Sequence, residues 1–161
     1  MSADGLDDDA IRRILGQTRA IALVGASANP ARAAHGVQEF LQRQGYDVTP
    51  VNPGLAGQSL LGRTVVAELA AAGPLDLVDV FRASEHAGAV IDEAIRLGAK
   101  TVWLQLGVID HEAAARGRAA GLAVVMDRCP AIEIARLAIA RLAIARIPRQ
   151  IGSNGSEGFS R

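Results

Sequence analysis

The segment Ala20-Ile21-Ala22-Leu23-Val24-Gly25 decides the fold, because it is a short apolar run that ends at a glycine. Small residues fill the turn at 26–32, and a helical pattern of apolar residues follows. A buried strand that leads through such a turn into a helix is typical of folds that offer backbone N–H groups to a phosphate. The segment therefore predicts an α/β fold of the nucleotide-binding kind.

Four more apolar stretches follow and alternate with helical patterns, most of which end at a glycine. The predicted strands, numbered one to five, are residues 20–25, 47–51, 77–81, 101–106 and 123–126. The predicted helices between and after them are residues 35–44, 64–72, 85–97, 111–120 and 132–147. Strands that alternate with helices imply right-handed crossovers and a parallel sheet. We expect one Rossmann-like, three-layer α/β domain over residues 1–147, with strand order 3-2-1-4-5, and a Gly/Ser-rich disordered tail over 148–161.

Composition narrows the function classes. The 161 residues carry 17 Lys+Arg and 17 Asp+Glu, so no net charge attracts nucleic acid or an anionic membrane. No apolar run reaches the roughly 20 residues of a membrane span. The single cysteine excludes an internal disulfide, and the three histidines are too far apart in sequence to suggest a metal site. The acidic start of the chain has no apolar core of a signal peptide, so we expect a cytoplasmic protein.

The phosphate-type turn differs from that of a dinucleotide domain. It does not read G-x-G-x-x-G, and strand two ends in Asn52-Pro53 where an acid would hold the ribose hydroxyls. Arg32 lies near the start of the next helix, where it can pair with a phosphate. These residues indicate a phosphorylated nucleotide other than NAD, although Arg32 leaves NADP open.

Ligands of open parallel sheets bind beyond the carboxyl ends of the strands, where the strand order reverses. With order 3-2-1-4-5 this crevice lies between strands one and four. Asp127, Arg128 and Cys129 follow strand five. The candidate ligand-binding residues that follow the other four strands are Gly25, Ala26, Ser27, Asn29, Pro30, Arg32, Val51, Asn52, Pro53, Phe81, Arg82, Gln105, Leu106 and Gly107.

Arg82 needs an anionic neighbour, because a cation near a helix N-terminus is unfavourable on its own. A phosphate is one candidate, and Glu85 or Asp127 is another. Ser84 is expected to cap the helix that follows.

Cys129 is the one residue with potential for covalent chemistry. A thiol at a helix N-terminus beside Arg128 can have a lowered pKa and form a mixed disulfide. A small buried residue at a tight turn is the structural alternative, and we favour it.

Five stretches resemble the small stand-alone CoA-binding proteins related to the CoA-binding domain of succinyl-CoA synthetase and acyl-CoA synthetases. They are V-G-A-S-A-N-P-A-R, G-Y-D-V-T-P-V-N-P, D-L-V-D-V-F-R, A-K-T-V-W-L-Q-L-G-V and V-V-M-D-R-C-P-A-I-E, in order from about residue 20 to 133. The resemblance implies a Rossmann-like domain that binds coenzyme A without catalysis. It places the nucleotide of coenzyme A against residues 25–32 and 51–53, and the pantetheine along residues 81–82 and 105–107. The family commonly has Arg-Pro-Ser where this chain has Arg32-Ala33-Ala34, so one hydroxyl near the helix start is missing.

Three functions are thus compared. The first is non-catalytic binding of coenzyme A or an acyl-CoA, with a regulatory role. The second is an NADP-dependent oxidoreductase, and against it stand Asn52 and the lack of a substrate domain. The third is an interaction protein that has lost its ligand and forms a homodimer through helix 132–147, whose repeated A-R-L-A-I pattern leaves it without a clear polar side.

Overall fold

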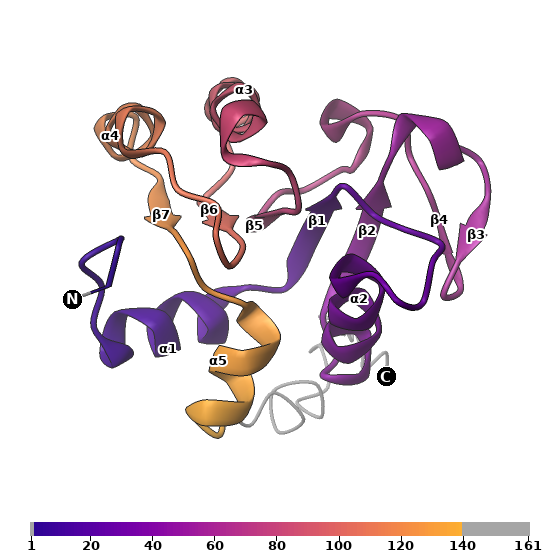
Figure 1. Cartoon of the computed structure of the whole chain (residues 1–161), viewed down its shortest axis with the longest axis horizontal. Coiled ribbons are helices and arrows are strands. Elements are labelled where there is room, and N and C mark those ends of the chain that lie inside the picture. Colours follow the sequence, from indigo (N-terminus) through magenta and orange to yellow (C-terminus); the bar gives the residue numbers. More distant parts are fainter. Residues whose placement is uncertain (1, 140–161) are drawn as a thin grey trace, which may run out of the picture.

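The centre of the protein is a parallel sheet. A computed structural model describes residues 2–139, and within them five parallel strands form this sheet in the order β2-β1-β5-β6-β7 (Figure 1). The strands are β1 (Ala20–Val24), β2 (Asp47–Val51), β5 (Leu77–Val80), β6 (Thr101–Leu104) and β7 (Ala123–Val125). All five predicted strands are therefore confirmed, each to within two residues, and so is the Rossmann-like α/β class.

Helices cover both faces of the sheet and complete the three layers (Figure 1). One face carries α3 (Ser84–Arg96) and α4 (His111–Ala119), which pack on one apolar cluster with strand residues such as Val78 and Val102. The other face packs on a second cluster that contains Leu23 and Trp103. Its helices are α1 (Asp8–Gln17), α2 (Ala33–Arg43) and α5 (Pro130–Arg136). No helix among residues 2–139 combines the length and the apolar character that crossing a membrane requires.

The predicted strand order 3-2-1-4-5 is wrong. In chain order the observed sheet reads 2-1-3-4-5, because the third strand, β5, pairs with β1 along the edge of β1 opposite to β2. After β2 the chain crosses to the other side of β1, where it forms β5. The adjacent strands β6 and β7 follow, connected through α3 and α4. The strand order therefore reverses between β1 and β5, and the crevice lies there instead of between the first and fourth strands.

The helix predicted over residues 64–72 is also wrong, because the connection from β2 to β5 has a different structure there. It contains the 3-10 turn η1 (Pro53–Leu55), the antiparallel strands β3 (Ser59–Leu60) and β4 (Arg63–Thr64), and the 3-10 turn η2 (Leu69–Ala71). The N–H of Val65 donates to Gln58 O at 2.9 Å, and the N–H of Val66 donates to Pro50 O at 3.0 Å. These long-range backbone bonds replace the i→i−4 bonds of a helix, and tertiary pairing overrides the helix propensity of the alanines.

The last predicted helix, 132–147, is also corrected where the structure describes it. Helix α5 starts earlier, at Pro130, and ends at Arg136, and Ala138 has a left-handed φ of 50°. Residues 140–147 lie outside the described part of the chain. So do the predicted domain limit at residue 147, the tail over 148–161 and half of the helix proposed for dimerisation.

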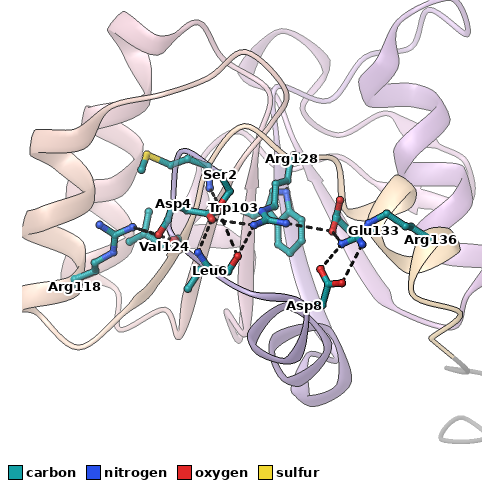
Figure 2. A network of polar contacts seen from close by, with 11 residues as sticks. Ser2, Asp4, Leu6, Asp8, Trp103, Arg118, Val124, Arg128, Glu133 and Arg136 are labelled. Carbon is teal, nitrogen blue, oxygen red and sulfur yellow. Dashed lines mark hydrogen bonds and ion pairs between the residues drawn. The ribbon is translucent and has the colours of Figure 1, made fainter.

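A polar network connects residues 2–8 to β7 and α5 (Figure 2). The carboxylate of Asp4 is fully buried and accepts hydrogen bonds from the N–H of Met126 at 3.1 Å and from Arg128 Nε at 2.9 Å. Arg128 also pairs with Glu133 at 3.4 Å. Burial alone would raise the pKa of Asp4, but the hydrogen bonds from Arg128 and from the backbone of Leu6 and Met126 hold it below its usual value.

Candidate functional site

The site begins at the glycine that ends β1. The N–H groups of Gly25 and Ala26 both donate to Val51 O, at 3.1 and 3.3 Å, and Gly25 has a φ of 89°. Phe81 N donates to Val24 O at 2.9 Å, so the ends of β2, β1 and β5 are fixed together. The turn therefore lies against its neighbours with no room for a side chain at residue 25.

A cavity of about 600 Å³ opens at this carboxyl edge of the sheet, within the range of small-molecule sites. Nine of the predicted residues line it, from the ends of β1, β2, β5 and β6. The structure thus brings together Gly25, Ala26, Ser27, Arg32, Asn52, Phe81, Arg82, Gln105 and Leu106. The prediction missed four other lining residues, namely Ala33, Ala34, Ala83 and Val108.

A second, smaller cavity of about 220 Å³ lies beside the first and shares Arg82 with it. Two more predicted residues, Val51 and Pro53, line this cavity. Val24 and Leu69 contribute further apolar surface to it. Glu68 and Glu93 also line it, so the second cavity is a mostly apolar slot with acidic side chains in its wall.

The other three predicted residues line neither cavity and shape loops instead. Asn29 Oδ1 accepts a hydrogen bond from Ala31 N at 3.0 Å, and Asn29 N donates to Ser27 Oγ at 3.1 Å, so both residues form the turn that contains Pro30. Gly107 has a φ of 78° and donates its N–H to Asp127 Oδ1 at 2.7 Å. These residues support the site from outside the cavities.

Arg32 and Arg82 are the cations of the cavity. Both residues are exposed, and within residues 2–139 neither guanidinium forms a hydrogen bond or an ion pair. The two carboxylates proposed as partners for Arg82 are engaged elsewhere, since Glu85 lies 3.6 Å from His86 Nε2 and Asp127 accepts from Gly107. Two unpaired guanidinium groups at one cavity favour an anionic ligand.

The N-terminus of α2 adds backbone donors to the same cavity. Arg32 is the N-cap residue but provides no side-chain cap, and the N–H groups of Ala33 and Ala34 have no acceptor among the described residues. Both alanines line the cavity. Free N–H groups and the helix dipole make such an end a site for anions. A better sequence-based boundary, with α2 starting at residue 33 instead of 35, would have included them.

Asn52 links two loops, and this explains the absence of an acid at that position. Its Nδ2 donates to Ala26 O at 2.8 Å, and its Oδ1 accepts from Gly54 N at 2.8 Å. A carboxylate could not make the first bond, because it has no donor. Asn52 lines the cavity, but its side chain holds the wall together.

Asp79, in the middle of β5, is the polar residue that sequence reasoning missed. Its side chain is fully buried, Gln105 Nε2 donates to its Oδ1 at 2.7 Å, and its Oδ2 has no partner. Burial raises the pKa of Asp79 to about 7, against a smaller lowering by the bond from Gln105. The signal was an acid in the centre of the otherwise apolar run at 77–81.

Three residues predicted near the edge have structural roles. Ser84 does not cap α3, whose N-cap is Ala83, and its Oγ accepts from Ile109 N at 3.0 Å and donates to Gly107 O at 3.3 Å. Cys129 is buried, and burial raises the pKa of its thiol, the opposite of the direction that an activated thiol needs. Arg128 lies in the network of Figure 2 and lines neither cavity.

Comparisons with known proteins agree with this geometry. A family model described as a CoA binding domain matches residues 19–135. The uncharacterized protein YneT of Bacillus subtilis (strain 168) is 38% identical over 120 residues, which cover 74% of this chain and 87% of YneT. The solved structure of a hypothetical protein from Pyrococcus horikoshii OT3 is similar with a TM-score of 0.81 and 38% identity, over 86% of this chain and 96% of that one.

A larger protein shares the fold. The structure of acetyl-coenzyme A synthetase 1 from Ca. Korarchaeum cryptofilum, in complex with phosphate and ADP, has a TM-score of 0.59 and 22% identity to this chain. The match covers 73% of this chain and 27% of that protein. At this identity the likeness concerns the fold alone.

Proposed function

We propose, from the premise that the chain belongs to the CoA-binding domain family, that it binds coenzyme A or an acyl-CoA at the carboxyl edge of its sheet. The observation that carries the proposal is the meeting of two unpaired guanidinium groups and two free backbone N–H groups at one cavity. We propose further that the binding is non-catalytic and serves a regulatory role.

The phosphates of coenzyme A suit the polar mouth of the cavity. The ligand carries a diphosphate and a ribose phosphate, so it can engage more than one cationic group. In our proposal Arg32 and the N–H groups of Ala33 and Ala34 take one phosphate group, and Arg82 takes another. Charge-assisted hydrogen bonds of this kind contribute about 1.5 to 3 kcal/mol each.

The apolar parts of coenzyme A suit the remaining surfaces. The apolar part of the slot, formed by Val24, Val51, Pro53 and Leu69, suits the flat face of an adenine ring. Glu68 and Glu93 also line the slot, and Arg82 lines both the slot and the main cavity. The pantetheine arm then follows Phe81, Gln105 and Leu106. Leu106 is 57% exposed, and an apolar side chain this open at a cavity rim gains from contact with a ligand.

The contents of the cavity support binding without catalysis. Histidine and cysteine are absent from its described lining, and Ser27 Oγ is engaged with Asn29 N. A nucleophile needs a base within hydrogen-bond reach, and the described lining offers no such pair. These facts are the support for the non-catalytic part of the proposal.

Thermal stability with separate ligands is the test. We expect coenzyme A and acetyl-CoA to raise the Tm, because a ligand at 100 times its Kd stabilises the folded state by about 2.7 kcal/mol. NAD should have no effect. A rise with NADP alone would favour the oxidoreductase, and no rise with any of the four would favour an interaction protein without a ligand.

Paired arginine variants locate the binding. Arg32→Ala should lower the affinity for coenzyme A by about 10- to 100-fold, as expected for loss of a charge-assisted bond. Arg19→Ala is the matched control, since Arg19 is also an exposed arginine whose guanidinium has no partner in the described chain but lies outside both cavities. Equal affinities of the two variants would place the ligand elsewhere.

A further inference from the structure

A buried carboxyl group lies next to the side of the cavity where the proposed pantetheine arm would run. Asp79 is on β5, whose neighbours are β1 and β6, and it is paired in register with Leu23 and Trp103. Its Oδ2 is one of two buried side-chain atoms without a hydrogen bond among residues 2–139. An apolar residue would cost less at such a position, so the acid needs a reason.

The buried acid is explained by its neighbour Gln105, which follows β6 and lines the cavity. Its Nε2 is held by Asp79 Oδ1 at 2.7 Å. The two buried unpartnered atoms of the described chain are Gln38 Oε1 and Asp79 Oδ2, so Gln105 Oε1 is not enclosed. No described group donates to this oxygen, so it is an accessible, unpaired acceptor on a residue that lines the cavity.

We propose that Asp79 is a positioning residue, which holds the Gln105 amide with its carbonyl oxygen toward the cavity and so selects a ligand group that donates a hydrogen bond. The amide N–H groups of pantetheine are donors of this kind. The inference rests on the proposed function and adds the residue pair that recognises the arm. Without Asp79 the Gln105 amide can turn over and present N–H groups instead, because its two ends are nearly equal in size.

A double-mutant cycle measures this coupling. The affinities for coenzyme A and for adenosine 3′,5′-bisphosphate, which lacks the pantetheine arm, are compared by calorimetry. Asp79→Val should lower the affinity for coenzyme A by about three- to tenfold, which corresponds to the loss of one hydrogen bond. The affinity for the bisphosphate should not change. The double variant with Gln105→Leu should bind coenzyme A no more weakly than Gln105→Leu alone.

A conservative variant separates positioning from folding. Asp79→Asn has nearly the shape of the natural residue and keeps one acceptor, so it should retain more affinity for coenzyme A than Asp79→Val. If Asp79→Val does not fold, the same cycle is measured with Asp79→Leu, which has nearly the shape of aspartate and no acceptor.

Two results would overturn the inference while leaving the proposed function in place. One is an equal loss of affinity for both ligands, and the other is additive losses in the double variant. A wild-type protein that binds neither ligand would overturn both the inference and the proposed function.

Discussion

A Cβ atom on Gly25 would collide with the carbonyl oxygen of Phe81, and it would also lie 3.1 Å from the Phe81 carbonyl carbon. The end of β1 and the end of β5 thus approach each other as backbone on backbone. This contact joins the two strands between which the strand order reverses. It also brings the phosphate-type turn next to Arg82, so it shapes the candidate site directly.

Gly25→Ala should therefore destabilise the fold by about 3 kcal/mol, because a side chain there meets both a steric clash and an unfavourable positive φ. Urea denaturation gives the free energy of unfolding. Gly36→Ala is the control, since Gly36 lies within α2 with open space around it and should become more stable by up to about 1 kcal/mol. Similar stability of the two variants would contradict the close approach.

Asn52→Asp should lower the free energy of unfolding by about 1 to 3 kcal/mol. The new carboxylate cannot donate to Ala26 O and would face that carbonyl oxygen with its own negative charge. Asn29→Asp is matched to it, because the Asn29 side chain is used only as an acceptor from Ala31 N and an aspartate can do the same. Chemical denaturation without ligand should show a loss for the first variant only.

The buried Asp79 gives stability a distinct pH dependence. Its pKa is about 7 in the folded protein, above the value near 4 of an unfolded aspartate. Between these values the folded state keeps a proton that the unfolded chain releases, so the free energy of unfolding falls as pH rises. The fall attributable to Asp79 is about 4 kcal/mol between pH 4 and pH 7.

Asp79→Asn isolates this contribution, because asparagine does not titrate. Urea denaturation at a series of pH values should give a flatter profile for the variant than for the wild type across this window. Carboxylates with lowered pKa, such as Asp4 and Asp76, act in the opposite sense, and they do so at lower pH. Parallel profiles would mean that Asp79 is charged in the folded protein throughout.

Asp4→Asn should cost about 3 kcal/mol, because it leaves the largely buried guanidinium of Arg128 without its main counter-charge. Asp9→Asn removes the acid of an exposed pair with Arg12 and should unfold at the same urea concentration as the wild type. The lowered pKa of Asp4 means that its contribution is present above its ordinary pKa and is lost as pH falls through the folded value. A midpoint for Asp4→Asn equal to that of Asp9→Asn would show that the network in Figure 2 adds no stability.

The elements of the sheet could be predicted because local chemistry defines them. The apolar run at 20–25 ends at a glycine that needs positive φ, and Gly98 and Gly121 follow helices in the same conformation. The order of the strands could not be predicted from such signals. It depends on which edge of β1 each neighbouring strand joins, β2 on one side and β5 on the other, and no local pattern encodes that choice.

The site was predictable to the extent that it consists of residues just past strand ends. Nine of the fourteen predicted residues line the main cavity, and they remain neighbours although the strand order differs. The role of each individual residue in the site was harder to predict from the sequence. The bonds of Asn52 to Ala26 and Gly54, and of Gln105 to Asp79, depend on side-chain directions that a one-dimensional pattern does not contain.

The bond between Asp4 and Arg128 spans 124 positions of the chain. Asp4 precedes all five strands of the described sheet in the chain, and its partner Arg128 follows them, just after β7. During translation this acid therefore remains without its counter-charge until nearly the whole sheet exists. The contact that holds residues 2–8 against the sheet therefore forms only after all five strands have been made. A nascent chain that stops before residue 128 lacks this contact.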